Sequence, residues 1–157
     1  MRSGSLLIAG LALLLTGFVG TGLLASGILS QQALGAEAAR GEWIFRTGTD
    51  PDTGRPIPYS GGMGMVMGCA GCHGLDGRGL RTPMFTSPDI TYRNLTDPAG
   101  MVEPDGSRGH RYTDELIRRA VTQGLDPAGR PLAWPMPRWQ LTDRQWQDLL
   151  AYLKALP

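Results

Sequence analysis

The chain has 157 residues, which is enough for one domain with a hydrophobic core and barely enough for two. Its formal net charge is +1 and its basic residues are scattered, so no nucleic-acid partner is expected, since such a surface would need a basic patch or stripe. Lys154 is the only lysine among the fifteen basic residues, which excludes a lysine-rich docking ring.

The N-terminus, residues 1–30, is expected to be a transmembrane anchor. The stretch Leu6–Leu29 holds 24 residues without a charge. A spanning helix needs about 20 residues, whereas the apolar core of a cleaved signal peptide has about 7–15. Arg2 precedes this stretch and predicts that the remainder of the chain is exported. Cleavage stays an alternative, because residues 33–35 and 36–38 both have a small-x-small pattern.

Residues 31–39 are predicted to be a linker, and residues 40–157 to be a single domain. The domain should begin with a helix that ends near Thr47 and Gly48. The residues that follow are dense in Pro, Gly, Asp and Ser, which predicts a loop or hairpin.

Two later helices are indicated by the residues at their ends. Thr113 is a predicted N-cap, and Gly124 is predicted to end the same helix. Thr142 and Gln145 have the spacing of a capping box at the start of the last helix. No run of residues convincingly predicts a strand. The apolar residues of the last helix follow the spacing of one buried face: Trp146, Leu149, Leu150 and Leu153.

Both cysteines of the chain belong to a Cys-x-x-Cys-His pattern, formed by Cys69, Cys72 and His73, which is typical of covalent haem attachment. On one turn of helix, the two thiols share a face and the imidazole lies one turn from Cys69. The two cysteines make half of a zinc site, which would need two more Cys or His ligands, and only His73 and His110 exist. A redox disulfide is disfavoured because no βαβ pattern surrounds the motif. The sequence therefore predicts one haem c.

A second axial ligand is expected, because haem iron held by histidine often takes a methionine on its other side. Met136 lies between two prolines that fix φ and prevent helix, so its thioether would lose little entropy on binding. Met136 is therefore the predicted sixth ligand. Met84 and Met101 lie in predicted loops without such a restraint, and His110, between two arginines, is predicted to face solvent.

These features resemble the class I c-type cytochromes. The resemblance covers roughly Ala36 to Pro157 and rests on RGEWIF, CAGCHGLDGRG, YTDELIRRAVTQGLDPAGRPL, MPRW and LTDRQWQDLLAYLKAL, in the family's order. It implies an all-α cytochrome c fold, with three to five short helices and long loops wrapped around one covalently attached haem. It also implies that the first and last helices cross, with Gly41 and Phe45 meeting Leu149 and Tyr152.

The resemblance further implies roles for residues around the haem. In the family, the sixth ligand is a Met-Pro position before the last helix, which corresponds to Met136. A proline carbonyl downstream of the motif accepts the N–H of the proximal histidine, which points to Pro88 or Pro83. Independently of the family, buried haem propionates would need donors. The candidate donors are Arg138, Trp139, Trp134 and Tyr112.

The chain departs from compact members of the family between its first helix and the haem motif, where an insertion occupies about residues 47–68. Met63, Met65 and Met67 alternate within it, so an extended chain would place all three on one side. Three roles are open for these methionines. They could seal the insertion onto haem or protein, bind Cu(I), or form a docking surface for a redox partner.

The predicted function is electron transfer by an exported mono-haem cytochrome, which is a carrier and not an enzyme. Its N-terminal helix would tether it to the cell membrane, with the haem domain on the extracytoplasmic, periplasmic side. Its expected partners are redox proteins, the membrane and other subunits of a membrane oxidoreductase complex. Two alternatives remain: a haem-based gas or ligand sensor with an open sixth site, and a copper-handling protein.

Overall fold

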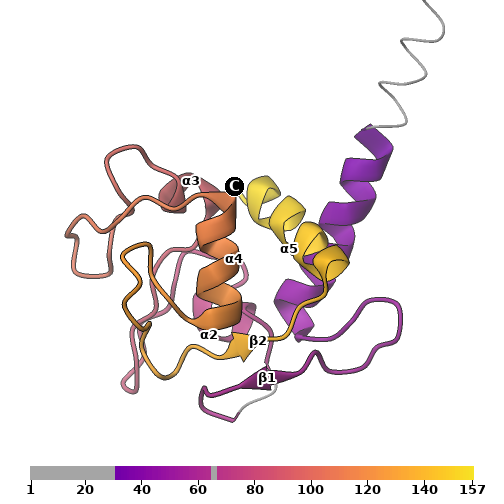
Figure 1. Ribbon diagram of the computed structural model, residues 1–157, viewed down its shortest axis with the longest axis horizontal. Coiled ribbons are helices and arrows are strands. Elements are labelled where there is room, and N and C mark those ends of the chain that lie inside the picture. The colour runs from indigo at the N-terminus through magenta and orange to yellow at the C-terminus, as the bar shows by residue number, and fades with distance from the viewer. Residues whose placement is uncertain (1–30, 65–66) are drawn as a thin grey trace, which may run out of the picture. The chain divides into compact units, whose positions relative to one another are not determined.

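The computed structural model describes residues 31–64 and 67–157 (Figure 1). Glu37–Pro157 form one compact unit. The predicted anchor, residues 1–30, lies outside the described residues. Among the helices that the structure describes, none is long and apolar enough to cross a membrane.

The compact unit consists of short helices joined by long loops, as predicted. Residues 31–47 are helical, so the first helix ends where the sequence predicted. Residues 31–39, the predicted linker, are helical as well, because their Gln, Ala, Leu and Glu residues favour helix. The other elements are β1 (Tyr59–Ser60), α2 (Ala70–His73), α3 (Tyr92–Leu95), α4 (Asp114–Gln123), β2 (Arg138–Trp139) and α5 (Asp143–Ala155).

The all-α prediction missed a two-stranded antiparallel sheet, in which Tyr59 pairs with Trp139 and Ser60 with Arg138. Strands of two residues are too short to produce the alternating pattern by which a strand is recognised in a sequence. This sheet joins the insertion to the segment directly before α5 (Figure 1).

The predicted ends of α4 and α5 are confirmed. The Thr113 hydroxyl accepts a hydrogen bond from the backbone N–H of Leu116, and Gly124 ends α4 in the left-handed region at φ 69°. At α5, the Thr142 hydroxyl accepts from the Gln145 backbone while the Gln145 side chain accepts from the Thr142 backbone. Both helices therefore begin with the N-caps that their sequences predict.

The first and last helices meet at a glycine. A Cβ on Gly41 would lie 1.9 Å from the carbonyl oxygen of Asp148, so only glycine permits this approach. One turn further along, the rings of Phe45 and Tyr152 lie 5.2 Å apart between centroids. The predicted crossing is confirmed at these residues, and Phe45 and Leu149 are among the most deeply buried side chains.

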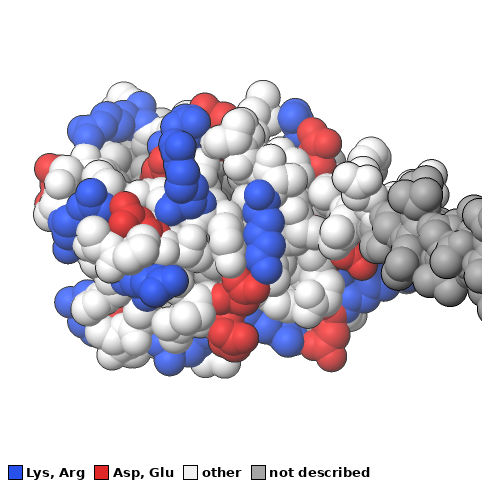
Figure 2. All heavy atoms as spheres, turned by 90° about the horizontal axis from the view of Figure 1, so that it is seen from above, with Lys and Arg blue, Asp and Glu red and all other residues white. Residues whose placement is uncertain are grey.

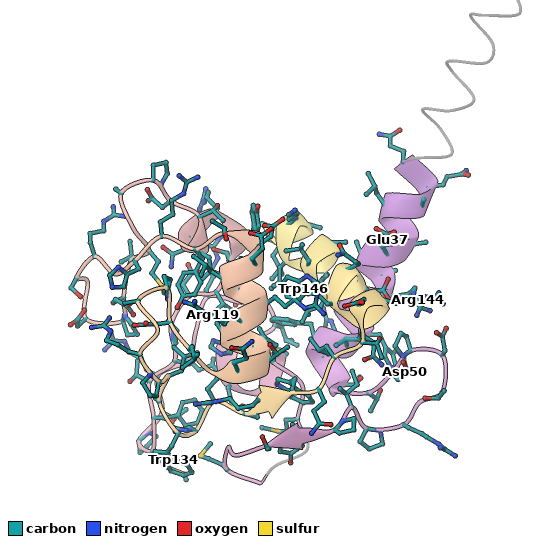
Figure 3. The ribbon with its side chains drawn as sticks, in the orientation of Figure 1. Glu37, Asp50, Arg119, Trp134, Arg144 and Trp146 are labelled. Atoms are coloured by element: carbon teal, nitrogen blue, oxygen red, sulfur yellow. The ribbon has the colours of Figure 1, made fainter. Side chains whose placement is uncertain are left out.

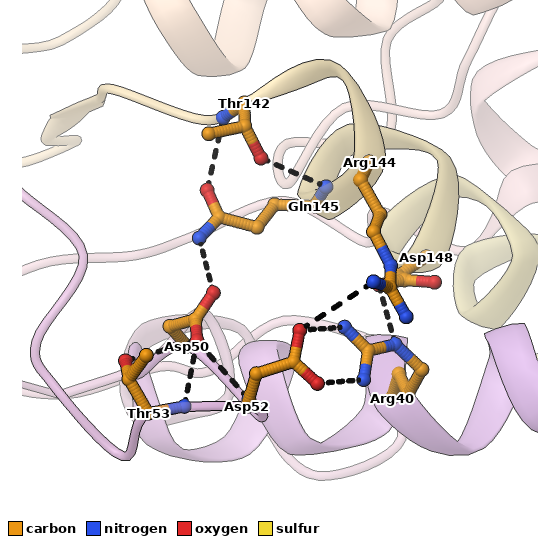
Figure 4. A network of polar contacts seen from close by, with 8 residues as sticks. All are labelled: Arg40, Asp50, Asp52, Thr53, Thr142, Arg144, Gln145 and Asp148. Atoms are coloured by element: carbon orange, nitrogen blue, oxygen red, sulfur yellow. Dashed lines mark hydrogen bonds and ion pairs between the residues drawn. The ribbon is translucent and has the colours of Figure 1, made fainter.

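A polar cluster ties the start of the insertion to these two helices (Figure 4). Arg40 donates through Nε to the buried carboxylate of Asp148 at 2.9 Å, and through its two terminal nitrogens to both oxygens of Asp52. Gln145 donates to Asp50 at 2.6 Å. The charges of the cluster therefore serve to fix the insertion in place. On the face drawn in Figure 2, basic and acidic side chains are interleaved.

We expect this cluster to make the unit acid-sensitive. Hydrogen bonds from Gln145, and then from Thr53, lower the pKa of Asp50 to about 2. Because this is below the value of an unfolded aspartate, the stabilisation by Asp50 is present above about pH 4 and is lost as the pH falls toward 2. Asp50→Asn should therefore be less stable than wild type at neutral pH, and the difference should shrink over that range. Urea midpoints from pH 7 to pH 2 measure this.

The matched control is Glu37→Gln, which removes an exposed carboxylate outside the cluster. Its urea midpoint should follow that of the wild type at every pH. A difference between Asp50→Asn and wild type that stays constant down to pH 2 would contradict the assignment.

Candidate haem site

An apolar cavity of about 380 Å³ lies inside the Glu37–Pro157 unit. Its walls come from the first helix, from α2, α4 and α5, and from the loops between them. This volume lies within the range of about 300–1,000 Å³ that small-molecule and cofactor sites occupy. The cavity is therefore large and apolar enough to take a prosthetic group.

The Cys-x-x-Cys-His motif forms one wall of this cavity. Cys69 occupies the N-cap position of α2, and the backbone N–H of His73 donates to the Cys69 carbonyl at 2.8 Å, which closes one helical turn. Cys69 and Cys72 form no disulfide and are half-buried as whole residues, and all three residues of the motif line the cavity. The structure thus brings together the three residues that the motif predicts for haem attachment.

Burial raises the pKa of the Cys69 thiol to about 12 and also raises that of Cys72. A raised pKa sets both cysteines apart from the low-pKa cysteines of redox disulfides. This agrees with an attachment role and disfavours the redox-pair alternative.

His73 is held in a single tautomer by its surroundings. Its side chain is buried, and Nδ1 lies 3.0 Å from the carbonyl oxygen of Pro88. A carbonyl can only accept, so Nδ1 carries the proton and Nε2 keeps its lone pair. Burial lowers the pKa of His73, which favours the neutral imidazole that a metal requires. Of the two prolines named from the sequence, Pro88 is the one that makes this contact.

Two residues that the sequence did not single out hold the Pro88 segment against the motif. The Ser87 hydroxyl donates to the Cys72 carbonyl and accepts from the Leu80 backbone. Gly79 has φ 85°, and a Cβ there would lie 2.3 Å from the carbonyl oxygen of Ser87. A glycine and a serine are too common in loops to have signalled these roles.

Met136 lies in a tight turn that borders the same cavity. Its backbone N–H donates to the Ala133 carbonyl at 3.1 Å, and its side chain is half-buried. The predicted sixth ligand therefore shares one cavity with Cys69, Cys72 and His73.

The other candidate ligands separate into two groups. Met63, Met67 and Met101 also line the cavity, and Met101 is only 3% exposed, although the sequence suggested an unrestrained loop. Backbone hydrogen bonds to Gly109 and His110 hold Met101 in place. Met84 is 81% exposed and lies outside the cavity lining. His110 is exposed, as predicted, and Met65 lies outside the described residues.

The four candidate propionate donors occupy different environments. Trp139 and Tyr112 are buried and line the cavity. Trp134 is 70% exposed and points away from the domain (Figure 3). Arg138 is not part of the lining, and its guanidinium donates to the backbone carbonyls of Leu132 and Met136. The structure therefore gives Arg138 a contact with the Met136 turn that the sequence did not indicate.

The residues present fit a covalently attached haem: two thiols and a neutral imidazole on one wall, a thioether in a turn, and apolar surroundings. The sequence model of the cytochrome c family matches residues 61–157, which include all four of these residues. No curated protein and no solved structure matches the chain. Since this match covers more than half of its length, the chain belongs to the cytochrome c family, binds haem c covalently at Cys69 and Cys72, and has the haem-based electron transfer of that family as its function.

Proposed function

We propose that this protein is an electron carrier whose haem iron is six-coordinate and is bound by His73 and Met136. The observation that carries the proposal is the single cavity bordered by both side chains and by the two cysteines. The sequence adds a physical reason for choosing Met136 over Met101, because prolines on both sides stiffen its turn before any ligand binds.

When bound, haem supplies reversible one-electron cycling between Fe(III) and Fe(II). The task of His73 is to present Nε2 as a neutral donor, since Nδ1–H is donated to Pro88. The Met136 thioether is also uncharged. A thioether favours the ferrous state more than a second imidazole does, so we expect a higher potential than bis-histidine ligation would give. With both residues bound, the iron would have no open position for oxygen.

Adding CO to the reduced, full-length holoprotein tests the proposal that it is an electron carrier with no open site on its iron. We expect a low-spin optical spectrum that CO leaves unchanged, whereas Met136→Ala should bind CO. A wild-type ferrous form that is high-spin and binds CO readily would instead support the sensor alternative, in which the sixth site is open.

We also propose that the protein is exported and tethered to the membrane, as a subunit of an oxidoreductase complex or a partner to one. The uncharged stretch Leu6–Leu29, with Arg2 before it, supports this orientation. If the protein is tethered in this way, N-terminal sequencing should find the original N-terminus. Detergent should extract the protein from the membrane fraction, whereas a carbonate wash should not. A mature N-terminus after residue 35 or 38 would indicate a cleaved signal peptide.

A copper-handling role has less support. Met63 and Met67 both line the cavity, and Met67 packs against Gly71, which lies within the haem motif. These contacts favour a sealing role for the methionines of the insertion. The test changes Met63, Met65 and Met67 together to leucine. If the copper alternative is correct, this variant should lose Cu(I) binding. If the methionines only seal the insertion, the variant should keep its electron transfer.

A further inference from the structure

Arg138 closes the turn that carries Met136. Its guanidinium donates to the carbonyl of Met136 and, at 3.1 Å, to the carbonyl of Leu132, so one side chain links both ends of the five-residue segment. A planar guanidinium suits this task, because its donors form a rigid fork. The position of the Met136 sulfur therefore depends on where Arg138 is held.

Gly124 leaves room for the Arg138 side chain. A Cβ on Gly124 would lie 1.6 Å from the Arg138 Nε, so the guanidinium packs against the end of α4 only because this residue is glycine. The Gly124 carbonyl accepts a hydrogen bond from the Leu132 backbone at 2.7 Å. The end of α4, the turn and Arg138 therefore form one connected unit.

The insertion fixes the other side of the same unit. Ser60 of β1 pairs with Arg138, and the Gln140 backbone donates to the Pro58 carbonyl at 2.8 Å. Trp139 is buried against the Tyr59 ring, with centroids 5.1 Å apart.

The next contact reaches the ligand turn itself. A Cβ on Gly62 would lie 3.1 Å from Cβ of Pro137 and 3.3 Å from the carbonyl oxygen of Pro135, the two prolines that flank Met136. The insertion thus touches the turn on both sides of the ligand residue.

We propose that the insertion and Arg138 act together as a positioning device for Met136, and that they set how often its sulfur leaves the iron. This inference rests on the proposed His73/Met136 ligation. The compact family members described above lack the insertion, so this chain holds its sixth ligand with contacts additional to the prolines. Arg138 acts through the backbone of the turn and is a positioning residue.

The test measures the affinity of the ferric full-length holoprotein for imidazole, which competes with Met136. Its apparent affinity is proportional to the fraction of molecules whose sixth site is open. Gly62→Ala and Gly61→Ala form a matched pair, because both glycines have positive φ but a Cβ on Gly61 meets nothing within 4 Å. Arg138→Leu is paired with Arg55→Leu, which removes an exposed charge from the insertion.

We expect Gly62→Ala and Arg138→Leu to bind imidazole roughly tenfold more tightly than their partners, a ratio that corresponds to about 1.4 kcal/mol. Equal affinities within both pairs, together with an open sixth site in Met136→Ala, would overturn this inference and leave the proposed function standing. If Met136→Ala binds imidazole as the wild type does, both fail. If Arg138→Leu does not fold, the comparison of Gly62→Ala with Gly61→Ala tests the inference by itself.

Discussion

Replacing Met136 with alanine is expected to lower the midpoint potential on the order of 100 mV or more, within the ~0.8 V range that axial ligands span. The loss of a thioether ligand removes the stabilisation of Fe(II) that a methionine provides. The ferric spectrum should change at the same time, because water or another weak ligand then takes the sixth position. An optically monitored potentiometric titration of both proteins measures the two effects together.

Two other methionines provide controls for this result. Met84→Ala removes an exposed thioether outside the cavity lining and should leave potential and spectrum unchanged. Met101 is buried in the cavity wall, so Met101→Leu should lower the free energy of unfolding and leave the midpoint potential nearly unchanged. If Met136→Ala retains the wild-type spectrum and potential, Met136 is not the ligand.

Replacing Gly41 with alanine is expected to destabilise the domain by about 3 kcal/mol or more. The new Cβ would lie 1.9 Å from the Asp148 carbonyl oxygen and 2.8 Å from the Tyr152 Cβ. The Asp148 carbonyl oxygen belongs to the backbone of α5 and cannot move away by a side-chain rotation, so the two helices would have to separate. Urea unfolding of the holoprotein measures the change in the free energy of unfolding.

Gly35→Ala is the matched control, because residue 35 is also helical and a Cβ there meets nothing within 4 Å. Alanine is favoured over glycine in a helix by about 1 kcal/mol, so this variant should be unchanged or slightly more stable. Equal stability of the Gly41 and Gly35 variants would contradict the close helix crossing.

Features governed by neighbouring residues were predictable from the sequence. The N-caps at Thr113 and Thr142 follow from local hydrogen bonding, and the αL end at Gly124 follows from the freedom of glycine. The motif at Cys69–His73 occupies one turn, so its shared placement in the cavity wall was also implied by spacing. The crossing at Gly41 came from the family resemblance and not from the spacing of the residues.

Features governed by distant contacts were not predictable in the same way. The pairing of Tyr59 with Trp139 joins two-residue strands, which leave no periodic signal. Arg138 donates to two backbone carbonyls, and backbone groups have no sequence signature. Met101 sits in a Gly- and Pro-rich stretch whose composition indicates exposure, and it is buried through its packing into the core.

Methyl NMR of the reduced full-length holoprotein tests most directly whether the sulfur bound to iron belongs to Met136. With all seven methionine methyl groups labelled with ¹³C, a ligated methyl over the porphyrin should be shifted far upfield by the ring current. We predict one such signal, absent from Met136→Leu and retained in Met101→Leu. An upfield methyl that persists in Met136→Leu, or no upfield methyl in the wild type, would contradict the account.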